Sequence, residues 1–136
     1  MQHIRNPRCF LVYALAPEGG SPAEANRLLN AYVADERRGL AVFHDHFIGR
    51  PGGVAIFFAE TAEQRAAIAD LGPLEGWHVE IRPLIYSRSP AGFDEQTAYT
   101  LRAYRNADWE KLRVEQRPRY GDPAREAETA EEDVGE

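Results

Sequence analysis

Short apolar runs alternate with amphipathic stretches along the first two thirds of the chain. The apolar runs cover residues 9–15, 40–48, 53–59 and 77–86, and the amphipathic stretches begin at Ser21 and Thr61. Short runs of apolar residues are typical of buried strands, whereas apolar residues spaced three and four positions apart indicate a helix with one buried side. The pattern therefore predicts the order strand, helix, strand, strand, helix, strand.

The stretch that begins at Ser21 carries helix signals at both ends. Ser21 is suited to cap the first turn, Pro22 suits the first helical position, and Glu24 would complete a capping box. Gly39 is expected to end the helix. The apolar stripe of this helix is Ala25, Leu28, Leu29, Tyr32 and Val33, and Arg37 and Arg38 fall in its last turn, where cations are favoured.

Local signals also place the second helix and one turn. Thr61 and Gln64 form a capping box, and Gly72 followed by Pro73 is expected to end that helix. Pro51 and the glycine after it predict the turn between the second and third strands.

The predicted strands differ in how polar residues are distributed. The first three contain few charges, which indicates that both faces of the sheet are covered. Pro83 cannot donate to a neighbouring strand, so we expect the fourth strand at an edge of the sheet. This strand alternates, with Trp77, Val79, Ile81 and Ile85 on one face and His78, Glu80, Arg82 and Tyr86 on the other.

Two helices can cover one face of such a sheet, and the other face needs a second cover. Residues 93–112 have helical character, and this segment or a second copy of the chain could supply it. The stripe of the segment is Phe93, Thr97, Leu101 and Tyr104, with Trp109 and Leu112 beyond. Because large apolar patches usually mark interfaces, we predict a twofold homodimer in which the C-terminal helix assists.

Charge divides the chain into a neutral body and an acidic end. The net charge of the 136 residues is −6, and the residues after 120 carry all of it, with seven acidic side chains against Arg125 alone. A neutral body offers no electrostatic surface for nucleic acid. We expect one domain over residues 1–117, followed by a flexible acidic tail over residues 118–136.

Composition also indicates where in the cell the protein is expected. The single cysteine, Cys9, excludes an internal disulfide and a cysteine-based zinc site, and we expect it to be buried and inert. No apolar run approaches the roughly 20 residues that a membrane helix needs, and no signal peptide is visible. We therefore expect a soluble, cytoplasmic protein without a membrane partner.

Two segments carry a resemblance to a known family. Residues 76–83 read GWHVEIRP, and residues 70–73, which begin with Asp70, precede them. The element order over residues 9–86 resembles the dimeric α/β-barrel superfamily of ferredoxin-like proteins, and GWHVEIRP is similar to the last strand of its YCII-related members. The resemblance implies an α+β, ferredoxin-like βαββαβ sandwich with an added C-terminal helix, two copies that face their sheets together, and one pocket per protomer.

The same resemblance bears on the pocket residues. It implies Asp70 as the acidic pocket residue of the family. Asn30 and Tyr32 lie near the position in the first helix where the family has a histidine, so the histidine of a His/Asp acid–base pair is missing from this chain.

Two histidines form the most reactive-looking group. His44 and His46 are two residues apart in a predicted strand and so share a face. Two imidazoles could act as acid and base or hold a metal ion with a third ligand. In a dimer of the resembled type, His78 of the partner could approach them. The alternative is that these residues bind water, backbone groups or a polar part of a ligand.

Asp45 between them would point to the opposite face. A carboxylate beside Phe43 and Phe47 needs a partner, and Arg50 is the expected one. The alternative is a general base with a raised pKa.

Aromatic residues could line a pocket for a planar, mostly apolar ligand. The candidates for ligand binding are Tyr13, Phe57, Trp77 and Tyr86. The alternative is core packing, and the strand register decides between the two.

These observations lead to two functional hypotheses. The first is a small-molecule-binding protein or an enzyme without a bound cofactor, which would use His44, His46, His78 and Asp70 for proton transfer or for oxidation of a small substrate such as an aromatic compound. The second is a non-catalytic dimeric module for binding or interaction.

Overall fold

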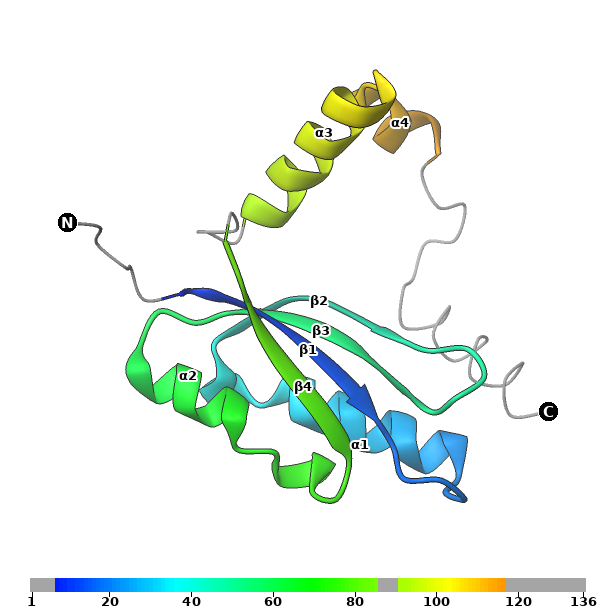
Figure 1. Ribbon diagram of the computed structural model, residues 1–136, viewed down its shortest axis with the longest axis vertical. Coiled ribbons are helices and arrows are strands. Elements are labelled where there is room, and N and C mark those ends of the chain that lie inside the picture. Colours follow the sequence, from blue (N-terminus) through cyan, green and yellow to red (C-terminus); the bar gives the residue numbers. More distant parts are fainter. Residues whose placement is uncertain (1–6, 86–90, 117–136) are drawn as a thin grey trace.

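One antiparallel sheet of four strands forms the centre of the structure (Figure 1). The computed structural model describes residues 7–85 and 91–116. The elements are β1 (Cys9–Leu15), α1 (Pro22–Ala34), β2 (Leu40–His46), β3 (Gly52–Phe58), α2 (Ala62–Ala69), β4 (His78–Leu84), α3 (Gly92–Arg105) and α4 (Trp109–Glu115), with 3-10 turns η1 (Glu36–Arg38) and η2 (Gly72–Leu74). The predicted succession of strands and helices is confirmed in an α+β fold. Tyr86 and the predicted tail over residues 118–136 lie outside the described residues.

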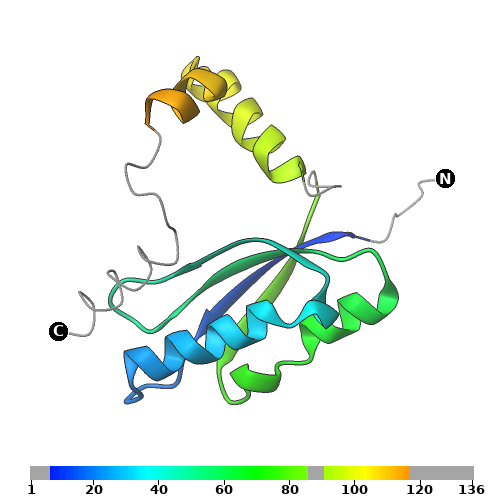
Figure 2. The same cartoon turned by 180° about the vertical axis from the view of Figure 1, so that it is seen from behind.

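The helices lie on both sides of the sheet. The strand order is β2-β3-β1-β4, so β2 and β4 are the edge strands, and the predicted edge position of Pro83 is confirmed. α1 and α2 cover one face, here called the helix side, and α3 and α4 lie over the other (Figure 1, Figure 2). We call this second face the open side. Its central residues are Leu11, Tyr13, Val54 and Ile56.

Capping side chains begin the helices where the sequence indicates. The hydroxyl of Ser21 accepts a hydrogen bond from the backbone N–H of Glu24 at 3.3 Å, and Thr61 and Gln64 form a reciprocal capping box. The carboxylate of Glu24 binds Arg27 instead of completing the predicted box at α1.

The first helix ends before the predicted Gly39. Asp35 adopts an extended conformation after Ala34, and its side chain accepts a hydrogen bond from the backbone N–H of Arg37. This contact caps a separate 3-10 turn, which Gly39 ends with a φ of 85°. A short polar residue that competes for backbone hydrogen bonds therefore stops α1 one turn early.

The main core lies between the sheet and α1, α2 and η2. Alternate residues of β1 and β3 point into it, as the two-residue period of a strand requires. Its buried members are Val12, Ala14, Ala16, Ala25, Leu29, Tyr32, Ala55, Phe57, Ala59, Ile68, Leu74 and Trp77. Cys9 is also buried, as predicted.

A β-bulge in β2 decides which side its later residues face. Val42 is skipped in the pairing with β3, between Ala41 and Phe43. One extra residue moves every later side chain of the strand to the opposite face of the sheet. His44 therefore pairs with Ala55 and faces the helix side, whereas a regular ladder would turn it to the open side.

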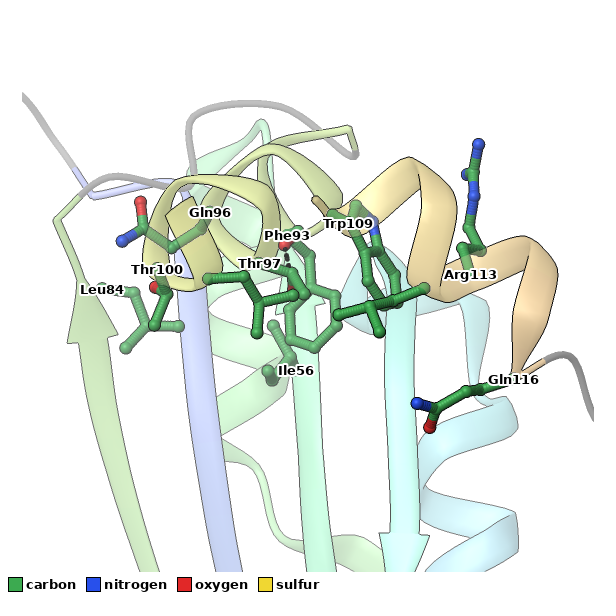
Figure 3. Close-up of a pocket in the computed structure, with 11 residues that line it drawn as sticks. Ile56, Leu84, Phe93, Gln96, Thr97, Thr100, Trp109, Arg113 and Gln116 are labelled. Carbon is green, nitrogen blue, oxygen red and sulfur yellow. Dashed lines mark hydrogen bonds between the residues drawn. The ribbon is translucent and has the colours of Figure 1, made fainter. Parts of the chain in front are cut away.

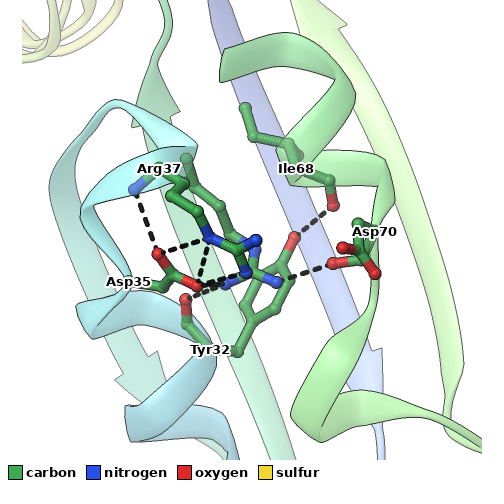
Figure 4. Close-up of polar contacts among 6 residues, drawn as sticks. Tyr32, Asp35, Arg37, Ile68 and Asp70 are labelled. Atoms are coloured by element: carbon green, nitrogen blue, oxygen red, sulfur yellow. Dashed lines mark hydrogen bonds and ion pairs between the residues drawn. The ribbon is translucent and has the colours of Figure 1, made fainter. Parts of the chain in front are cut away.

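A fully buried arginine, Arg38, joins the two helices of the helix side, and Figure 4 labels its partners Tyr32, Asp35 and Asp70. The guanidinium of Arg38 donates hydrogen bonds to the backbone oxygens of Tyr32 at 3.1 Å and Asp70 at 2.6 Å, and it lies 3.1 Å from the carboxylate of Asp35. Its central carbon lies 4.1 Å from the centre of the Tyr32 ring. A buried charge needs such partners, and these come from α1, its cap and the end of α2.

Tyr32 in α1 also connects α1 to α2 and to the sheet. Its hydroxyl donates a 2.6 Å hydrogen bond to the backbone oxygen of Ile68 in α2, and its ring meets Phe57 of β3 edge-on at 5.7 Å. Burial raises the pKa of the Tyr32 phenol to about 12, and the positive charge of Arg38 opposes part of this rise. Contacts of Tyr32 and Arg38 thus join α1, η1, α2 and β3 at one place.

Neighbouring arginines provide a matched test of this network. We expect Arg38→Ala to lower the free energy of unfolding by about 3–5 kcal/mol, because it leaves a cavity and removes the donor from two backbone oxygens. Arg37→Ala removes an exposed ion pair with Asp35 and is expected to leave the unfolding midpoint close to that of the parent. Urea unfolding followed by circular dichroism measures both, and equal midpoints for the two variants would contradict the role given to Arg38.

Tyr32 also predicts a loss of stability at alkaline pH. A phenol whose pKa is higher in the folded chain than in the unfolded chain contributes stability that is complete below pH 10 and is lost as pH rises toward about 12. We expect Tyr32→Phe to be less stable than the parent at pH 8 by about 1–3 kcal/mol, because the oxygen of Ile68 loses its donor. The difference between the two proteins should shrink above pH 10. A constant difference from pH 8 to pH 11.5 in urea unfolding would refute this.

Candidate functional site

The predicted site residues are divided between the two faces of the sheet. His44 and His46 lie on the helix side of β2, and their ring centres are 5.7 Å apart. Nε2 of His46 lies 2.9 Å from Oδ1 of Asn30 in α1. The bulge at Val42 is the physical reason for this placement.

His78 lies on the other face and at the other edge. It begins β4 on the open side, where its ring centre is 6.5 Å from that of Tyr13 and its Nε2 is 3.7 Å from a carboxylate oxygen of Glu80. A second copy stacked on the open side would therefore not bring its His78 to His44 and His46. In this register the structure does not bring the three histidines of the predicted group together.

Asp45 and Asp70 do not join the histidines. Asp45 faces the open side, and its carboxylate accepts a 2.8 Å hydrogen bond from the backbone N–H of His46. The expected partner, Arg50, instead binds the backbone oxygen of Ala16. Asp70 caps the end of α2 with an exposed side chain, and it is its backbone oxygen that contacts Arg38.

The aromatic candidates also separate. Phe57 and Trp77 are buried in the helix-side core, where packing accounts for both. Tyr13 is the open-side member, 36% exposed, and its ring centre lies 5.3 Å from that of Phe47. Tyr86 lies outside the described residues.

A pocket lies between α3, α4 and the end of the open side (Figure 3). Its volume is about 740 Å³, and its lining is mostly apolar. The apolar lining residues are Ile56, Leu84, Phe93, Leu101, Trp109 and Leu112. Sequence reasoning found the C-terminal stripe, but it missed Ile56 and Leu84, since only the folded arrangement shows which part of the sheet lies under α3.

Contacts at the corner between α3 and α4 shape this pocket. Asn106 adopts a left-handed conformation with a φ of 52° and ends α3, and the side chain of Asp108 then caps α4. The indole N–H of Trp109 donates a 2.7 Å hydrogen bond to Asp94 at the start of α3. α4 therefore starts as a new helix and brings Trp109 back over α3.

One aromatic contact connects α3 to the sheet beside the pocket. The rings of Phe93 in α3 and Phe43 in β2 are stacked, with their centres 5.4 Å apart and an angle of 18° between their planes. Phe43 faces the open side because of the same bulge that turns the histidines away. The contact fixes the first turn of α3 against β2.

The polar groups of the lining are mostly amides and hydroxyls. They belong to Gln96, Thr97, Thr100 and Gln116, and the hydroxyl of Thr97 donates to the backbone oxygen of Phe93 at 3.0 Å. Of the described lining residues, Arg113 alone is charged, and its guanidinium pairs with Glu110 and lies 3.9 Å from Asp94. Such a lining suits a neutral ligand with a few hydrogen-bonding groups.

Two further features concern the whole of the described ranges, residues 7–85 and 91–116. In these ranges no three or more side chains of His, Cys, Asp or Glu are grouped so that they could hold a metal ion. None of the helices in the described ranges has the length and apolar character needed to span a membrane.

Comparisons with known proteins gave no match, whether to family models, to curated proteins or to solved structures.

Proposed function

We propose that this protein binds a small, neutral, largely apolar molecule between α3, α4 and the open side of the sheet. The observation that carries the proposal is the pocket of about 740 Å³ with apolar walls and a few amides and hydroxyls. Pockets of this size and composition are typical of sites for small organic ligands. His44, His46, His78 and Asp70 are not among the residues that line it, so the proposal is one of binding, without a catalytic step.

We further propose a ferredoxin-like, dimeric α/β-barrel protein related to the YCII-like proteins. The strand order β2-β3-β1-β4, with both helices of the βαββαβ unit on one face, supports the ferredoxin-like part of this proposal. The resemblance of residues 76–83 to the last YCII strand supports the family part. The proposed fold leaves one face of the sheet available for a partner.

A homodimer through the open side is the third part of the proposal. α3 and α4 lie over the end of this face that carries Ile56 and Leu84, and Ile56 is 8% exposed. On the same face, Phe43 remains 38% exposed beside its stack with Phe93, and Leu40 is 52% exposed. Apolar side chains that remain exposed side by side favour an interface. A second copy would cover them and close the pocket from the side that α3 and α4 leave open.

Ligand binding can be tested with the neutral fluorophore N-phenyl-1-naphthylamine. We expect it to bind the full chain with increased fluorescence. Leu101→Lys should weaken binding at least about tenfold, since it places a charge in an apolar wall. Tyr99→Ala, on an exposed part of the same helix outside this pocket, is the matched control and should bind like the parent. No binding, or equal binding by the Leu101 variant, would overturn the proposed site.

Sedimentation velocity at micromolar concentrations tests the dimer separately. We expect twice the mass of one chain. Val54→Lys, in the middle of the open side, should give monomers that keep the circular dichroism spectrum of the parent, because it adds a charge to the proposed interface. Glu63→Lys, on the exposed surface of α2, is the control and should remain a dimer. A parent protein that sediments as a monomer would refute the dimer and leave the pocket to be judged by the fluorophore.

A further inference from the structure

A second group of side chains lies on the opposite side of the sheet from the pocket, where β2 passes under α1. It consists of His44 and His46 from the strand and Asn30 from the helix. His44 and Asn30 are exposed, and His46 is half-buried. Solvent therefore has access to a site made of two imidazoles and one amide.

The two rings are spaced as the ligands of one ion would be. Their centres are 5.7 Å apart and their planes are nearly perpendicular, at 80°. Two imidazole nitrogens that each lie about 2.0–2.1 Å from one ion place their ring centres roughly 4.5–6.5 Å apart, depending on the angle between the two bonds. Since the residues are two apart on one strand face, the backbone itself maintains this spacing.

The amide of Asn30 offers a third ligand beside His46. Its Oδ1 is 2.9 Å from Nε2 of His46. Neighbouring donor atoms on one transition-metal ion are about 3 Å apart at the usual bond lengths. The hydrogen bond between Asn30 and His46 can therefore be replaced by two bonds to an ion with little movement of either side chain.

From this geometry we propose a binding site for a divalent transition-metal ion, with His44 and His46 as nitrogen ligands and Asn30 as an oxygen ligand. Neutral imidazole and amide donors suit borderline ions, and affinity among these ions is greatest for Cu²⁺. Water completes the coordination. The site uses neither the pocket nor the dimer interface, so it stands or falls independently of the proposed function.

The proposal depends on the bulge in β2. Without it, His44 and His46 would face the open side, away from α1, and Asn30 could not reach them. A histidine pair alone is a common and unspecific feature of sequences. What distinguishes this pair is the oxygen that α1 places beside it.

Copper titration of the whole chain tests the proposal, with one precaution. His3 lies outside the described residues and offers a competing imidazole, so every protein tested carries His3→Gln. Isothermal titration calorimetry measures stoichiometry and affinity, and electron paramagnetic resonance reports nitrogen ligands of Cu²⁺. We expect one Cu²⁺ per chain with imidazole nitrogen coordination.

Three substitutions and one control locate the ion. His44→Gln and His46→Gln should each weaken Cu²⁺ binding at least about tenfold and remove one nitrogen from the spectrum. Asn30→Ala should weaken it by a smaller factor and keep both nitrogens. His78→Gln, on the opposite face, should bind like the parent. No binding by the His3→Gln protein, affinity that is unchanged in the His44 and His46 variants, or an equal loss in the His78 variant would overturn the site.

Discussion

The structure depends on one constraint: β1 and β3 are apolar on both of their faces, and the two helices of the βαββαβ unit cover only one. On the helix side, Val12 and Phe57 are sealed beneath α1 and α2. On the open side, Leu11 and Ile56 need a different cover. α3 and α4 supply part of it, and the pocket lies where they meet the sheet. Because apolar surface left in water costs free energy in proportion to its area, the open side is where a ligand or a second copy would gain the most.

The two faces are stabilised by different means. The helix side is held by a buried network in which Arg38 and Tyr32 connect α1, η1, α2 and β3. α3 and α4 are largely exposed and are held mainly to each other, through Trp109 and Asp94, with the stack of Phe93 on Phe43 as a link to the sheet. Binding sites are commonly built from the less stabilised parts of a fold. The pocket is on that side of this protein.

Periodicity and capping signals were sufficient to predict the order of elements, because these depend on neighbours in the chain. Ser21 and Thr61 cap helices, and Pro83 lies in an edge strand. The faces of β2 could not be predicted in this way. β2 reads as four apolar residues followed by three polar ones, without alternation, so no sequence period reveals the bulge at Val42.

The burial of Arg38 could not be predicted from the sequence either, which placed this residue in the last turn of the first helix, where cations are favoured. The reason is that its partners are two backbone oxygens and a ring brought together by the fold. Every residue has a backbone oxygen, so the sequence does not indicate which of them will accept a hydrogen bond from Arg38. Of the candidate pocket, only the wall that α3 supplies could be predicted from the sequence. The stripe of Phe93, Thr97 and Leu101 indicates an apolar helix face. The opposite wall includes Ile56, which belongs to a strand that is apolar throughout, so the sequence does not show which of its residues face the pocket.

The bulge at Val42 has consequences on both faces at once. By turning His44 and His46 toward α1, it puts His46 within hydrogen-bonding distance of Asn30, and by the same displacement it turns Phe43 toward the open side, where Phe93 stacks on it. A single extra residue in β2 therefore separates the polar chemistry from the apolar pocket. Because bulges re-aim side chains at fixed positions, deleting that residue would exchange the two faces of the strand rather than simply weaken it. The arrangement of both candidate sites thus traces back to one irregularity in the ladder between β2 and β3.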